Sequence, residues 1–162
     1  MKKLILSAVV TILFATTALA QAPIIAEFRN IISNIPTNFV AMKKDLINEN
    51  KDTGIQIFTT NLKLSPICQG IITAKKDGNN VLVLNYELAN MDSLMSRMFY
   101  MMVPQYIKEI NEMVQSGKYT GSDGEVDGMS TTTVKDLNGN IVVQYQSNST
   151  EHRIRFFGNA KK

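Results

Sequence analysis

One stretch near the middle of the chain, residues 90–117, carries apolar side chains at intervals of three and four. They are Leu94, Met95, Met98, Met102, Tyr106, Ile110 and Met113 or Val114. This spacing predicts an amphipathic helix packed against a core. Asn90 or Asp92 can cap its start, and Gly117 stands where a C-terminal cap glycine belongs. Because a proline ring removes an amide donor, Pro104 predicts a kink or a break just before it.

Two shorter helices are expected near the start of the chain. In the first, the apolar residues on one helical face are Ile24, Ile25, Phe28, Ile31, Ile32 and Ile35, and Pro36 ends the helix. A second helix is expected from Thr37 or Asn38 to about Asn48.

The remaining chain contains extended segments that predict strands, and in the clearest of them, as at Leu82, Leu84 and Tyr86, apolar side chains share one face. The expected strands cover residues 55–64, 67–75, 81–88, 129–135, 140–146 and 151–157. Turn-forming residues follow three of the strands, at 76–80, 137–140 and 147–150. The acidic, glycine-rich residues 118–127 are expected to form a loop.

Together these elements predict an α+β fold, in which helices cover one face of an antiparallel sheet. We expect a single domain over residues 21–162. Each half of it has a helical segment interrupted by proline, followed by three strands, so the halves 22–88 and 90–158 are possible repeats of one unit.

Residues 1–20 have the three parts of a secretory signal peptide, in a style typical of bacteria. Two lysines precede an apolar run over 4–14, and Ala18-Leu19-Ala20 forms a cleavage site with the cut expected after Ala20. The alternative is an uncleaved anchor, for which the apolar run is short. We therefore expect a periplasmic or secreted protein with no integral membrane segment after cleavage.

The net charge bears on which classes of partner to expect, and the cysteine count bears on whether disulfides stabilise the fold. Loss of Lys2 and Lys3 leaves 17 − 2 = 15 basic residues against 14 acidic ones, a balance that gives no reason to expect nucleic acid. The single cysteine, Cys68, excludes an intramolecular disulfide, so the core alone must hold the fold. We interpret Cys68 as a small buried hydrophobe; an exposed thiol that bridges two chains is the alternative.

The sequence has no residue pattern typical of catalysis. The only histidine, His152, falls on the apolar side of its strand with Ile154 and Phe156, which favours a structural role. There is no glycine-rich phosphate loop and no H-E-x-x-H motif. Catalytic triads assemble from distant positions, so an enzyme stays open as a hypothesis, but we favour a non-enzymatic protein without a cofactor.

Two clusters imitate metal sites without completing them. Asp123, Glu125 and Asp127 alternate as in a calcium loop, but the twelfth position is Val134 instead of a carboxylate, which favours a solvated acidic loop. Thioether groups suit Cu(I). The methionines at issue are Met91, Met95, Met98, Met101 and Met102, and most of them lie on the core stripe of the central helix, so no metal is predicted.

The last two strands supply the favoured binding surface. Gln144 and Gln146 on one strand, and Arg153 and Arg155 on the next, occupy the polar side of the sheet. Arginine and glutamine offer bidentate donors and adaptable hydrogen bonds, which suit a protein partner. The alternative is that this is the ordinary solvated side of an antiparallel sheet.

The leading hypothesis is therefore an exported non-enzymatic protein that binds another protein through this polar face. Its rival is a carrier of an apolar small molecule, held between the methionine-rich helix and the sheet. The rival's site residues are Met95, Met98, Met102 and Tyr106.

In element order alone, two helix-then-sheet units, the chain resembles the secreted β-lactamase-inhibitor proteins. That resemblance implies an exposed sheet face that grips a protein partner. The domains of those inhibitors are linked by disulfides, which a chain with one cysteine lacks, and no residue of theirs is carried over.

Overall fold

The computed structural model describes residues 25–62, 68, 70–75 and 78–158, and the predicted leader lies outside them. Within these residues eight strands form one antiparallel sheet in the order β1-β2-β3-β4-β8-β7-β6-β5. The strands are β1 (Lys43–Asn50), β2 (Ile55–Thr60), β3 (Gly70–Lys75), β4 (Val81–Glu87), β5 (Tyr119–Val126), β6 (Met129–Asp136), β7 (Ile141–Ser147) and β8 (Glu151–Phe157).

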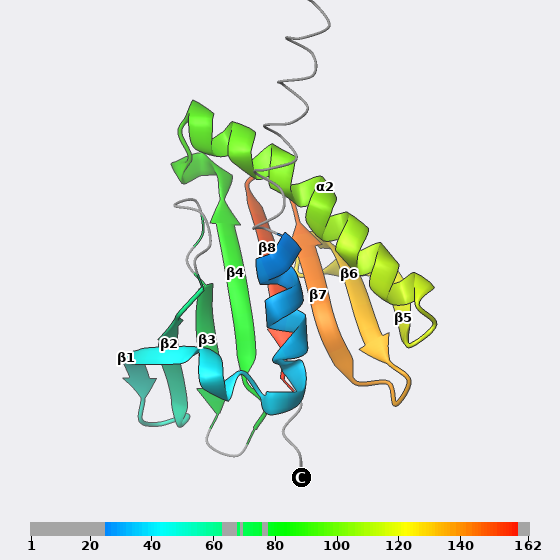
Figure 1. Ribbon diagram of the computed structural model, residues 1–162. Coiled ribbons are helices and arrows are strands. Elements are labelled where there is room, and N and C mark those ends of the chain that lie inside the picture. The colour runs from blue at the N-terminus through cyan, green and yellow to red at the C-terminus, as the bar shows by residue number, and fades with distance from the viewer. Residues whose placement is uncertain (1–24, 63–67, 69, 76–77, 159–162) are drawn as a thin grey trace, which may run out of the picture.

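Two α-helices in the described part of the chain lie against the same face of this sheet (Figure 1). The first covers residues 25–33, and the second is α2 (Ser93–Gln115). Short 3-10 helices precede β1 and α2: η1 (Ile35–Thr37), η2 (Val40–Met42) and η3 (Leu88–Asn90). The predicted α+β class, with helices on one face of an antiparallel sheet, is confirmed.

The two halves of the chain meet in the middle of the sheet. The first helix leads into the β1–β4 meander, and α2 leads into the β5–β8 meander. The last strands of the two meanders, β4 and β8, pair antiparallel from Val81 opposite Phe157 to Glu87 opposite Glu151. Each half therefore contributes four strands to one continuous sheet, where the sequence predicted three; a repeat over 22–88 and 90–158 stays a prediction.

The prediction of a helix over residues 37–48 is wrong. Asn38 and Phe39 both adopt the left-handed region, each with φ of 56°, which a right-handed helix does not pass through. This turn directs the Phe39 and Met42 side chains into the core, where they are buried. The chain then runs into β1, whose backbone pairs with β2.

The prediction of a loop over residues 118–127 is also wrong, because most of these residues form β5. This strand pairs with β6 along its whole length, from Tyr119 opposite Asp136 to Val126 opposite Met129. Most of its side chains are exposed, and it forms one edge of the sheet. Backbone hydrogen bonds to β6 define this strand, and the sequence shows no apolar–polar alternation that would have predicted it.

The central helix begins and ends as predicted. The Asp92 side chain accepts a hydrogen bond from the Met95 amide at 2.8 Å, and Gly117 adopts φ of 72° just beyond the end. Pro104 lies within α2 but does not break it. Both Pro104 and Tyr100, whose carbonyl loses its usual partner, are on the exposed side, where water can replace the missing donor.

The core lies between the helices and the sheet. Tyr106 of α2 stacks on Phe28 of the first helix and shares a buried 2.9 Å hydrogen bond between its hydroxyl and that of Tyr86 on β4. The Arg29 guanidinium also joins the two helices, since it donates to both carboxylate oxygens of the buried Glu109 at 2.9 Å. These contacts fix both helices on one side of the sheet.

Cys68 is buried, and burial raises the pKa of its thiol to about 11. At neutral pH the thiol is therefore protonated and a weak nucleophile. This agrees with its interpretation as a small buried hydrophobe.

Replacement of Tyr106 by phenylalanine should destabilise the fold by about 1 kcal/mol, because the buried hydrogen bond between the two tyrosine hydroxyls is lost. Tyr100, which is 61% exposed on the same helix, is the matched control: Tyr100→Phe should change the free energy of unfolding by less than about 0.5 kcal/mol. Urea denaturation measures both. Equal effects would contradict the assigned role of the tyrosine pair.

Candidate binding face of the sheet

The sheet has an inner face, toward the helices, and an outer face, which neither described helix covers (Figure 1). Strand alternation sorts the residues between them. On β4 and β8, Leu82, Leu84 and Ile154 point inward and are fully buried. Their neighbours in sequence, among them Arg153 and Arg155, lie on the outer face.

Strand register brings the four predicted partner-binding residues together at the centre of the outer face. Gln146 is opposite Arg153, and Gln144 is opposite Arg155. Asn85 on β4 lies on the other side of Arg153. The face that the sequence predicted is therefore one contiguous block of side chains on three adjacent strands.

Gln146 was predicted to lie on an open surface, but it is only 1% exposed. Its Nε2 lies 3.4 Å from the Thr131 hydroxyl on β6, so the side chain extends along the sheet instead of away from it. Its Oε1 has no hydrogen-bond partner in the described part of the chain. A buried amide oxygen without a donor is costly, and native structures seldom leave one without a purpose.

The two arginines differ in their pairing. Arg153 forms an ion pair with Glu151, and both side chains are about a quarter exposed. Arg155 makes no hydrogen bond or ion pair with any described residue, and burial together with the Arg153 charge lowers its pKa. Since a guanidinium stays charged in proteins, Arg155 is a partly buried cation without a contacting counter-ion.

The outer face also has an apolar half that the sequence analysis missed. Its partly buried side chains continue the rows that contain the arginines: Ile71 is opposite Val83, and Val83 is opposite Arg155. The apolar set is Ile55, Ile57, Ile71, Val81, Val83 and Phe157. The available signal was the Val-Leu-Val-Leu run at 81–84, which is apolar on both faces of its strand and is typical of strands covered on both sides.

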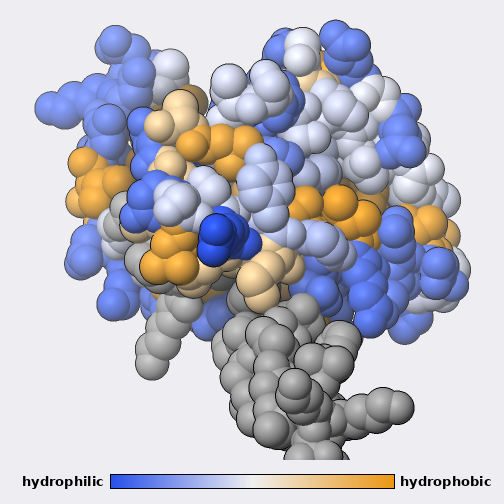
Figure 2. Space-filling view, turned by 90° about the horizontal axis from the view of Figure 1, so that it is seen from above, coloured by the Kyte–Doolittle hydropathy of each residue, from blue (hydrophilic) through white to orange (hydrophobic). Residues whose placement is uncertain are grey.

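The residues of the rival small-molecule site lie mainly in the core. Met102 and Tyr106 are each 1% exposed, and Met95 and Met98 are partly buried against the same cluster. Seen from above, hydrophobic surface occurs in separate patches with hydrophilic side chains between them (Figure 2). α2 itself exposes Leu94, Tyr100, Met101 and Ile107.

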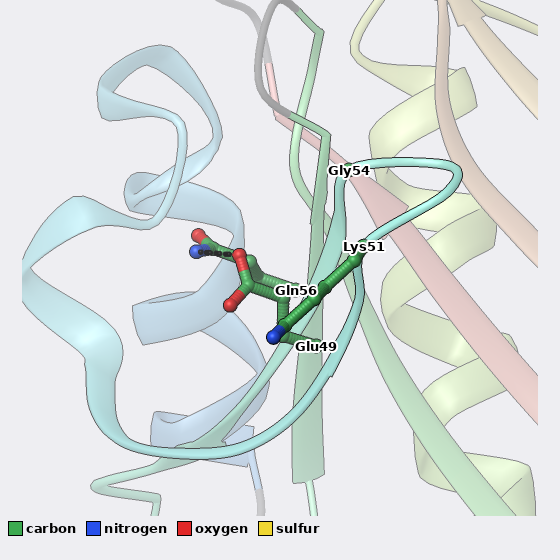
Figure 3. A pocket seen from close by; sticks show the side chains of 4 residues that line it. All are labelled: Glu49, Lys51, Gly54 and Gln56. Carbon is green, nitrogen blue, oxygen red and sulfur yellow. Dashed lines mark hydrogen bonds between the residues drawn. The ribbon is translucent and has the colours of Figure 1, made fainter.

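A hollow of about 480 Å³ lies at the β1–β2 hairpin, lined by Glu49, Lys51, Gly54 and Gln56 (Figure 3). The Gln56 amide donates to a Glu49 carboxylate oxygen at 3.0 Å, so part of the polar lining is already paired. Its single carboxylate and single ammonium do not form an acid–base or metal-binding arrangement.

The acidic residues that imitate a calcium loop do not form a metal-binding cluster with other described residues. No three acidic, histidine or cysteine side chains come together among the described residues. Asp123 belongs to β5 and accepts a hydrogen bond from the Thr132 hydroxyl across the hairpin at 2.7 Å.

Within the described ranges, no helix is long and apolar enough to cross a bilayer.

His152 is partly buried on the inner face, as its alternation predicted. Its ring packs edge-on against Phe99 at 4.7 Å, and its Nδ1 lies 2.6 Å from the Tyr145 hydroxyl. Burial lowers the pKa of His152 below 6.5.

The unfolded chain therefore binds this proton more readily than the folded one, so His152 should destabilise the protein as the pH falls below 6.5. Urea denaturation at pH 8 and pH 5.5 measures the loss. In His152→Gln the loss should be smaller. An identical pH dependence in the variant would contradict a buried neutral imidazole.

Gln146→Met removes the unpaired buried oxygen while it keeps the length of the side chain. We expect the free energy of unfolding to stay level or to rise by up to about 1 kcal/mol, because the desolvated acceptor is lost. Gln144→Met, at a partly exposed position on the same face, should change it little. A loss of more than about 1 kcal/mol in Gln146→Met alone would show that the amide stabilises the fold.

No protein-family model matches the sequence, and comparison with curated proteins gives no match. Among solved structures, the chain is similar to the solution structure of cyanobacterial PsbP (CyanoP) from Synechocystis sp. PCC 6803. The TM-score is 0.30 and the identity 13%, over 68% of this chain and 78% of that one. A likeness of this size supports no functional argument, so function rests on the chain's own residues.

Proposed function

We propose that this chain is an exported, non-enzymatic binding protein that engages another protein through the outer face of its sheet. One observation carries the proposal: the outer face, which neither described helix covers, joins an apolar half to a block of arginine and amide side chains. Protein interfaces combine an apolar centre with surrounding polar groups in the same way.

The chemistry of the face supports binding more than an ordinary solvated surface does. The exposed side of an antiparallel sheet normally carries fully hydrated polar residues. Here Ile71, Val83 and Phe157 are only partly buried, and Arg155 is partly desolvated without a paired acid. A partner that covers this face would bury the apolar side chains and supply a counter-charge, both of which are favourable.

The rival carrier function receives less support. A ligand beside Met102 and Tyr106 would have to displace core side chains that are 1% exposed, including one that hydrogen-bonds Tyr86. The described structure packs these residues against the sheet.

Site-specific photocrosslinking in the producing cells tests the proposal. A benzoylphenylalanine at Gln144, on the outer face, should crosslink to one defined protein, whereas the same group at Tyr100, on the exposed side of α2, should not. The Arg153→Ala, Arg155→Ala double variant should reduce the Gln144 crosslink at least tenfold, since it removes both cations from the face.

Thermal unfolding of the double variant serves as the control for folding. If the two positions give the same crosslinks, or if a folded double variant crosslinks as well as the parent, the outer face is not the binding site.

A further inference from the structure

Three unused polar groups lie close together on the outer face. The Oε1 of Gln146 and the Oδ1 of Asn85 are buried oxygens without hydrogen-bond partners among the described residues. The guanidinium of Arg155 makes no hydrogen bond or ion pair with the described residues. The face thus combines two buried acceptors that lack donors with one cation whose acidic neighbours, Asp127 and Glu151, do not contact it.

Register places these groups at defined positions. Asn85 and Gln146 flank Arg153 from opposite sides, on β4 and β7, so their strands are about 10 Å apart. Arg155 lies two residues along β8 from Arg153, about 7 Å away and on the same face. The spacing of the three groups matches the span of one extended segment of a ligand.

Their chemistry defines the ligand. A guanidinium only donates hydrogen bonds and prefers a carboxylate, which it can hold through two parallel bonds. The two amide oxygens accept, and so they require N–H or O–H donors. Gln146 is held by one long hydrogen bond of 3.4 Å to Thr131, and because its oxygen and that of Asn85 are buried, both amides must turn outward to meet such a donor.

We propose that the partner presents an acidic peptide segment to this face, with a glutamate or aspartate carboxylate on Arg155 and neighbouring N–H groups on Gln146 and Asn85. The proposal rests on the proposed function and specifies the chemistry of its partner. Acidic sugars carry similar groups, but the adjoining apolar half, which contains Val83 and Ile71, favours a partner with apolar side chains.

Titration with defined peptides, followed by the Nε–H signals of arginine in NMR spectra at low salt, tests this proposal. The probes are octaglutamate and, as a neutral match, octaglutamine. We expect a saturable shift of the Arg155 signal with octaglutamate and at least tenfold weaker binding of octaglutamine. Arg155→Gln should abolish the interaction, and Arg155→Lys should weaken it about fivefold or more because a lysine cannot form the bidentate pair.

Arg97→Gln is the matched control, since Arg97 is exposed on α2 and carries the same charge away from this face. Binding that falls equally in Arg97→Gln and Arg155→Gln would overturn the proposal in favour of non-specific charge attraction. Tighter binding of an oligogalacturonate than of octaglutamate would overturn it in favour of an acidic glycan.

The crosslinking experiment separates this proposal from the proposed function. If the Gln144 crosslink persists in Arg155→Gln and octaglutamate does not bind, the face binds a protein without a carboxylate at Arg155, and only the acidic-segment proposal fails. If both the crosslink and the peptide binding are absent, both proposals fail.

Discussion

The antiparallel pairing of β4 with β8 is the constraint on which the rest of the structure depends. It joins the last strand of each half from Val81 opposite Phe157 to Glu87 opposite Glu151, and so turns two four-stranded meanders into one sheet. The inward side chains of these two strands, such as Leu84 and Ile154, are fully buried beneath the helices. Without this seam neither the shared core nor a continuous outer face would exist.

The same seam creates the candidate site. Because both described helices pack on the inner face, the outward residues of β4, β7 and β8 form a surface of their own (Figure 1). Arg153 and Gln146 belong to consecutive strands, whereas Asn85 comes from β4 in the other half of the chain, and the pairing of β4 with β8 makes the three residues neighbours. The site is therefore a product of strand order, and its polar groups are left incompletely paired by the fold that positions them.

The elements that bury a regular stripe of side chains could be predicted from the sequence. The central helix, its Asp92 cap and the alternation in β4, β7 and β8 follow from local periodicity. The two edge strands could not be predicted, since most side chains of β1 and β5 are exposed and their strand geometry comes from backbone pairing with distant residues. Likewise, alternation put Gln146 on the outer face, but only the register beside Thr131 and Arg153 explains its burial.

The most direct test of the account is the reactivity of a thiol on the outer face in the native compartment. Val83→Cys should react with a maleimide in the purified protein and should be protected in intact cells, where the partner is present. Leu82→Cys, in the core, should stay unreactive in both settings, and Leu137→Cys, at a turn residue that is 72% exposed, should react in both. Equal labelling of Val83→Cys in cells and in the purified protein would contradict the claim that this face is covered by a partner.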